Sequence, residues 1–84
     1  MKVLKFRQDA CPQCDNMDLM LHALDLLDKV EVVHINDDNR DEIKSKFNIL
    51  STPTLIKLND EGKEVARVTR LQFGEIQELF DDID

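Results

Sequence analysis

The sequence has 84 residues, enough for one folded domain with a single core and too few for two. Its net charge of −7 would repel the phosphates of nucleic acids, and no apolar stretch approaches the roughly 18 residues of a membrane span. We therefore expect one soluble domain over residues 1–84, a monomer without nucleic-acid or membrane partners. The first residues lack the apolar segment of a signal peptide, which favours the cytoplasm.

The first half of the chain reads as a buried strand followed by an amphipathic helix. Val3, Leu4 and Phe6 form a short apolar run that Lys5 interrupts. From Pro12 to about Asp28, apolar residues then recur at helical spacing, which predicts a helix packed on a sheet. The stripe comprises Met17, Met20, Leu21, Leu24 and Leu27, widened by Leu19, Ala23 and Leu26.

The second half reads as three strands and two helices. A strand at residues 30–35 and a polar turn precede a short helix at residues 40–47, which Asn48 can end in a left-handed conformation. Strands at 54–58 and 64–69, joined by a turn containing Gly62, should pair antiparallel. A last helix follows from Gly74, with apolar positions Ile76, Leu79, Phe80 and Ile83. The order β-α-β-α-β-β-α predicts an α/β fold.

A pair of cysteines, Cys11 and Cys14, stands where the first strand gives way to the helix. Their spacing is about one helical turn, so the sulfurs can form a small disulfide or a dithiol. Cys11 falls at the helix N-cap, where free N–H groups and the helix dipole stabilise a thiolate, which makes it the candidate nucleophile. Cys14 would then resolve the mixed disulfide. Pro12, at the first helical position, stiffens the turn, and Gln13 completes the motif.

The cysteine motif, followed by Thr52-Pro53-Thr54 at this distance, resembles the thioredoxin superfamily over nearly the whole chain. The resemblance implies a three-layer fold, with a central four-stranded mixed sheet and helices on both faces. It also implies that Pro53 is cis, lies against the cysteines and exposes the backbone of Thr52 to an extended substrate. The length resembles that of a glutaredoxin, whereas residues 49–80 look more like a thioredoxin.

Four departures from the thioredoxin pattern bear on the site. Ala10 replaces a tryptophan and Thr69 replaces a glycine, so both belong with Thr52 and Pro53 to the predicted substrate-binding surface. Lys5 stands where thioredoxins carry a buried acid, and His34 where they carry a lysine. One hypothesis is that Lys5 or His34 favours the Cys14 thiolate by opposite charge. The alternative is that Lys5 extends to the surface and His34 points to solvent.

The leading functional prediction is a cytosolic thiol-disulfide oxidoreductase that reduces protein disulfides and holds no cofactor beyond the redox-active disulfide Cys11–Cys14. Its electron donor would be a thioredoxin-reductase-like protein or glutathione. A glutathione-dependent glutaredoxin is one alternative. However, Gln13 stands where glutaredoxins carry a tyrosine, and residues 69–72 lack their Gly-Gly-x-Asp motif. A redoxin dedicated to ribonucleotide reductase is another. Two further alternatives are not redox enzymes. One is a metal-binding module in which His22 or His34 joins the cysteines as a ligand, and the other is a redox-inactive adaptor.

Overall fold

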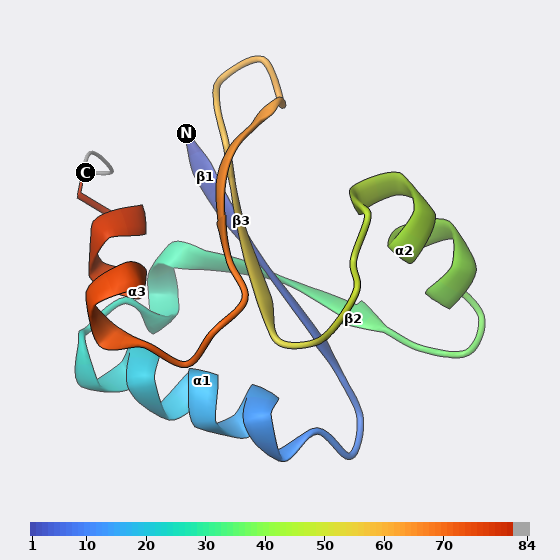
Figure 1. The fold of residues 1–84 in the computed structure, drawn as a ribbon, viewed down its shortest axis with the longest axis horizontal. Coiled ribbons are helices and arrows are strands. Elements are labelled where there is room, and N and C mark those ends of the chain that lie inside the picture. The colour runs from blue at the N-terminus through green and yellow to red at the C-terminus, as the bar shows by residue number, and fades with distance from the viewer. Residues whose placement is uncertain (82–84) are drawn as a thin grey trace.

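Residues 1–81 of the protein are described by a computed structural model (Figure 1). They form a four-stranded sheet in the order β2-β1-β3-β4, in which β1 runs parallel to β2 and antiparallel to β3, and β3 runs antiparallel to β4. The elements are β1 Lys2–Gln8, α1 Pro12–Ala23, the 3₁₀ turn η1 Leu27–Lys29, β2 Val30–Ile35, α2 Arg40–Phe47, β3 Thr54–Leu58, β4 Glu64–Val68 and α3 Phe73–Leu79.

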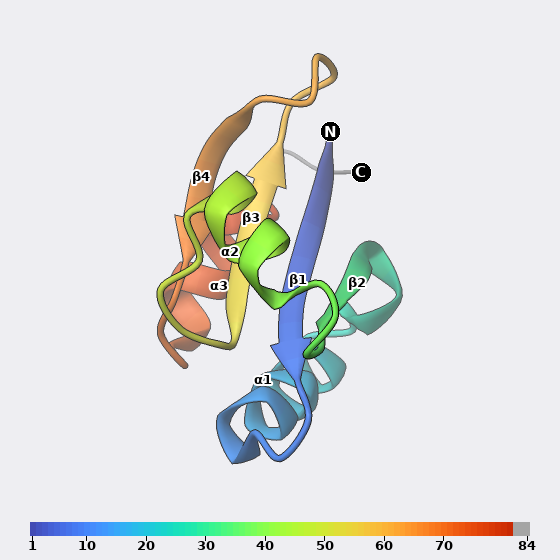
Figure 2. The same cartoon turned by 90° about the vertical axis from the view of Figure 1, so that its right-hand side faces the viewer.

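The helices cover both faces of the sheet, as the resemblance implied, with α1 and α3 on one face and α2 on the other (Figures 1 and 2). Successive residues of β1 point to opposite faces, so the strand contributes to a separate apolar cluster on each side. The cluster under α1 and α3 contains Val3, Met17, Leu21, Leu55, Val68, Ile76, Leu79 and Phe80. The cluster under α2 contains Leu4, Phe6, Ile35, Ile49, Ile56 and Leu58.

The end of α1 differs from the prediction. The helix stops at Ala23, five residues before the expected Asp28, because Asp25 takes a left-handed φ of 59°. The Leu26 N–H donates to the carbonyl of Leu21 at 2.8 Å, and the Asp25 N–H to that of His22 at 3.0 Å, the bonding of a Schellman terminus. Three residues assigned to the buried stripe are exposed: Leu19 and Ala23 within the helix, and Leu27 beyond its end.

The other boundaries lie at or near the predicted residues. The strands at 30–35 and 54–58 and the helix at 40–47 have the expected bounds, and Asn48 ends α2 with a φ of 54°. β4 ends one residue early, and α3 begins one residue before Gly74. Ile83, predicted for the last apolar stripe, lies outside the described residues. Within residues 1–81, none of the helices has the length and apolar character needed to span a membrane.

Candidate redox site

The two cysteines lie at the junction of β1 and α1 and are joined by a disulfide with a Cα–Cα distance of 5.2 Å. The chain turns from strand to helix through Ala10, which adopts a left-handed φ of 53°. Cys14 has no exposed surface and faces the sheet, whereas 7% of Cys11 remains exposed. Cys11 is therefore the sulfur that a second molecule reaches first.

Cys11 is the N-cap of α1, as the sequence predicts. The backbone N–H of Cys14 donates to its sulfur over 3.1 Å, and Pro12 at the first helical position has no N–H to satisfy. The N–H groups of Cys14 and Asp15 also approach the Cys11 carbonyl, at 3.0 and 3.2 Å. When the disulfide is reduced, a sulfur in this position is favoured as thiolate by the N–H donor and by the positive end of the helix dipole.

The loop before β3 packs against Cys11. The Thr52–Pro53 peptide bond is cis, and Pro53 is buried. The Cys11 sulfur lies 3.9 Å from the Thr52 carbonyl oxygen and 3.6 Å from the Thr52 hydroxyl. The hydroxyl of Thr54 donates to the Ser51 carbonyl at 2.7 Å and closes the turn. The fold therefore brings the cysteine motif and the Thr52-Pro53 segment, 41 residues apart in sequence, into contact.

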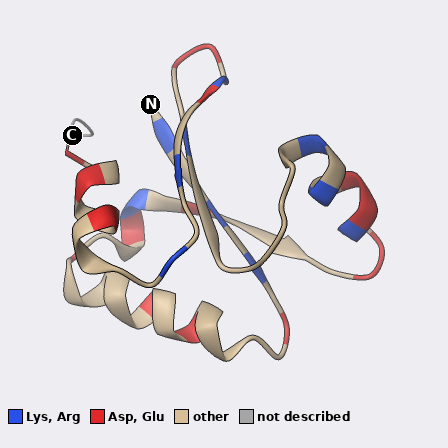
Figure 3. Ribbon diagram, in the orientation of Figure 1, with Lys and Arg blue, Asp and Glu red and all other residues tan. Residues whose placement is uncertain are grey.

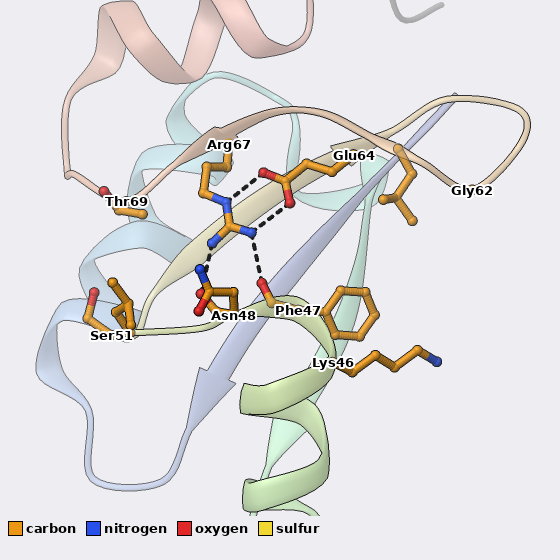
Figure 4. Close-up of a pocket in the computed structure, with 10 residues that line it drawn as sticks. Lys46, Phe47, Asn48, Ser51, Gly62, Glu64, Arg67 and Thr69 are labelled. Carbon is orange, nitrogen blue, oxygen red and sulfur yellow. Dashed lines mark hydrogen bonds and ion pairs between the residues drawn. The ribbon is translucent and has the colours of Figure 1, made fainter.

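A hollow of about 730 Å³ lies between α2, β4 and the loop before β3 (Figure 4). Ser51, Thr69 and the 86% exposed Leu50 line it, together with Arg67. Neither cysteine lines this hollow. Its link to the redox site is Ser51, which directly precedes Thr52 in the chain. Of the other predicted substrate-binding residues, Ala10 is exposed at the start of the cysteine motif.

Beneath the cysteines, charged side chains lie between β1 and α1. The side chain of Lys5 is only 3% exposed and forms an ion pair with Asp18 of α1. Arg7 binds the other oxygen of the same carboxylate at 2.6 Å and reaches Asp15 at 3.1 Å. Burial lowers the pKa of Lys5, the charge of Arg7 lowers it further, and Asp15 opposes both. The alternative in which Lys5 extends to the surface is therefore wrong.

His34 lies elsewhere. Its side chain is 46% exposed at the end of β2, and its Nε2 is 3.1 Å from a carboxylate oxygen of Asp9. The surface alternative thus describes His34 but not Lys5. His22, the other histidine offered as a metal ligand, is exposed in the last turn of α1. Among the described residues, no three His, Cys, Asp or Glu side chains are grouped so that they could hold a metal ion.

The sequence was compared with models of known protein families. The thioredoxin family model matches residues 1–82. The chain belongs to the thioredoxin family. A thioredoxin-family chain with a Cys-x-x-Cys pair at disulfide distance is a thiol-disulfide oxidoreductase, and the enzyme class follows for this protein.

One sequence relative and several solved thioredoxin structures are similar to this chain. The SPbeta prophage-derived thioredoxin-like protein YosR of Bacillus subtilis (strain 168) is 25% identical over 83 residues, covering 99% of both chains. Thioredoxin from Trypanosoma brucei brucei superposes with a TM-score of 0.72 at 25% identity, over 98% of this chain and 73% of that one. Thioredoxin 1 from Thermosipho africanus gives 0.68 at 22% identity, over 96% and 91%.

Sequence inspection overlooked two members of this thioredoxin site, Arg7 and Asp18. Both had a detectable signal. Arg7 follows Lys5 at the strand period of two, so the two cations share a face of β1. Asp18 stands four residues after Cys14, on the helix face that the cysteine shares, where an apolar residue would be expected. An acid on the buried side of a helix beside a strand with two inward cations indicates an ion pair.

Proposed function

We propose that this protein reduces disulfide bonds of other proteins in the cytosol, with Cys11 as the nucleophile and Cys14 as the resolving thiol. The observation that carries the proposal is the position of the Cys11 sulfur, at the N-cap of α1 and against Thr52. A sulfur there is favoured as thiolate, and it retains the only exposed surface of the pair.

The reaction proceeds by two exchanges at sulfur. The Cys11 thiolate attacks one sulfur of the substrate disulfide, forms a mixed disulfide and expels the other substrate sulfur as a thiolate, which takes a proton from water. The Cys14 thiolate then attacks Cys11, which forms the Cys11–Cys14 disulfide and releases the second substrate thiolate. Two electrons pass from the dithiol to the substrate. An external reductant must restore the dithiol before the next turnover.

The proposed substrate contact is an extended segment that lies along Thr52. The Thr52 carbonyl oxygen lies 3.9 Å from the Cys11 sulfur, so a segment that pairs with the backbone of Thr52 would bring its disulfide to Cys11. Ala10 and Thr69, both exposed, flank this approach and replace a larger and a smaller residue of common thioredoxins. We expect this surface to accept a different and narrower set of protein disulfides than a general thioredoxin does.

The electron donor decides between the two proposed subclasses. The test measures NADPH-coupled reduction of a model disulfide in parallel reactions, one with a thioredoxin reductase and one with glutathione and glutathione reductase. We expect turnover with thioredoxin reductase, because the glutathione-binding motifs of glutaredoxins are missing at Gln13 and at residues 69–72. Turnover with glutathione alone would instead place the protein with the glutaredoxins.

Two variants make the assay specific to the proposed roles. Cys11→Ser should abolish turnover, because the remaining thiol, Cys14, is fully buried and has no second cysteine with which to form a disulfide. Cys14→Ser should stop after the first exchange and accumulate a mixed disulfide on Cys11 that mass spectrometry detects. A Cys11→Ser variant that turns over as fast as the parent, or a Cys14→Ser variant that accumulates no adduct, would overturn the assignment of roles.

A further inference from the structure

The Lys5–Asp18 ion pair lies next to the inner cysteine. Cys14 and Asp18 are four residues apart on α1, so their side chains are neighbours on one face of the helix, with Cβ atoms about 5–6 Å apart. Cys14 is fully buried on that face, and Asp18 holds the ammonium group of Lys5 there. The buried ammonium group of Lys5 is therefore bound to a carboxylate that lies one helical turn along α1 from Cys14.

Lys5 and Asp18 should have opposite effects on the ionisation of the Cys14 thiol. In a region shielded from water, a nearby cation favours the thiolate, and a nearby anion disfavours it. Lys5 has 3% of its side chain exposed and Asp18 has 28%, so solvent screens the cation less than the anion. Arg7 draws on the same carboxylate at 2.6 Å, which leaves less of the Asp18 charge to neutralise Lys5.

The remaining charged groups around this position are paired or more distant. On α1, Asp15 contacts Arg7 and is 69% exposed. On β2, His34 and Asp9 pair with each other at the surface. On β3, Lys57 shares the sheet face but lies opposite Val3, two residues further from the cysteines, where it lines a hollow with the α3 acids Glu75 and Glu78. Of the two cations that bind Asp18, Lys5 is more deeply buried than Arg7, so solvent screens its charge less.

We propose that Lys5 favours the thiolate of Cys14 and that Asp18 limits this effect by neutralising part of the Lys5 charge. The inference rests on the proposed function, since a Cys14 thiolate matters only if Cys14 resolves mixed disulfides. In that step the Cys14 sulfur bonds to Cys11, the bond between Cys11 and the substrate sulfur breaks, and the substrate leaves as a thiolate that water protonates. Lys5 and Asp18 are positioning residues, because neither exchanges a bond.

The test uses a Cys11→Ser background, in which Cys14 is the only cysteine. Ultraviolet absorbance of the thiolate, followed against pH, then reports Cys14 alone. We expect Lys5→Met to lower the thiolate-to-thiol ratio of Cys14 at a given pH by about tenfold and Asp18→Asn to raise it by about as much. The double variant should lie close to the parent. A purely structural pair would shift both single variants in the same direction.

Both variants should fold, because the charged group that remains in each still has a hydrogen-bond partner. Methionine retains the apolar stem of Lys5 while Arg7 still binds Asp18, and an asparagine oxygen can still accept from Lys5. Circular dichroism verifies folding of each variant. Matched controls remove the same charges at exposed positions: Lys2→Met, on the same strand, and Asp28→Asn, in η1. Neither control should move the titration, and one that moves it as far as its counterpart would overturn the proposal.

A kinetic readout in protein with both cysteines provides a second check. After a thionitrobenzoate disulfide reacts with Cys11, the second release of coloured thiol reports attack by Cys14. A tenfold change in thiolate should alter this rate about threefold, because nucleophilicity falls as the thiol becomes more acidic. The rate should fall in Lys5→Met and rise in Asp18→Asn. No change in either rate or titration would refute the Lys5 effect, whereas failure of the donor assay alone would refute only the proposed function.

Discussion

The two faces of β1 bury side chains of different kinds. Toward α2 the strand presents Leu4 and Phe6, and the Phe6 ring packs on Phe47 with centroids 5.0 Å apart. Toward α1 it presents Val3, then Lys5 and Arg7 as it approaches the cysteines. In Figure 3 the segments of β1 that carry Lys or Arg are drawn in blue. The buried residues on the α2 face are therefore apolar, whereas the α1 face becomes charged toward the redox site.

The two faces of the sheet also differ in how deeply their ion pairs are buried. The α2 face also has an ion pair, Arg67 with Glu64, but this pair lies at the edge of the sheet on β4, where solvent reaches it (Figure 4). The Lys5–Asp18 pair lies under α1, where burial has already lowered the pKa of Lys5. The edge pair joins two residues of one strand and is screened by solvent, whereas a buried pair under the helix can act on the chemistry of a neighbouring sulfur.

The largest expected effect tests the apolar face. Phe6→Ala removes a fully buried ring and should lower the free energy of unfolding by about 3–5 kcal/mol, through lost burial and the cavity left behind. Urea unfolding of the oxidised protein measures this. The matched control is Leu50→Ala, an apolar truncation at an 86% exposed position, which should change stability by less than about 0.5 kcal/mol. Equal costs would contradict the assignment of Phe6 to the core.

An intermediate effect tests the edge of the α2 face. Arg67 donates to the carbonyls of Phe47 at 2.8 Å and Asn48 at 3.2 Å, and so ties β4 to the end of α2. Arg67→Met leaves both carbonyls without this donor and should cost about 1–2 kcal/mol in urea unfolding. Arg40→Met, which removes a guanidinium paired with exposed Asp37, is the control and should cost under about 0.5 kcal/mol. Equal losses of stability in the two variants would show that the hydrogen bonds from Arg67 to α2 have no structural role.

The smallest expected effect depends on pH. Hydrogen bonds from Arg67 hold the pKa of Glu64 below its ordinary range, more than burial raises it. A carboxyl with a lowered folded pKa adds stability above its unfolded pKa and loses that contribution as pH falls through the folded value. Glu64→Gln should therefore cost about 0.5 kcal/mol near neutral pH, given its exposure, and nothing in acid. Urea midpoints at both pH values measure the difference, and a gap independent of pH would contradict it.

Most of the fold was predictable because it rests on local patterns. The bounds of β2, α2 and β3 follow from runs of apolar and β-branched residues and from the turn residues between them. The end of α1 was not predictable in this way. Apolar residues continue at helical spacing past Ala23, and only the left-handed Asp25 and its backbone hydrogen bonds show where the helix stops.

The redox site divides in the same manner. The cysteine pair and the N-cap position of Cys11 were predictable because each depends on a few adjacent residues, and the Thr52-Pro53 segment was predictable from the family resemblance. The burial of Lys5 against Asp18 and the surface position of His34 became clear from the packing of the elements. A side chain's charge is written in the sequence, but its partner and its access to water depend on which helix covers which part of the strand.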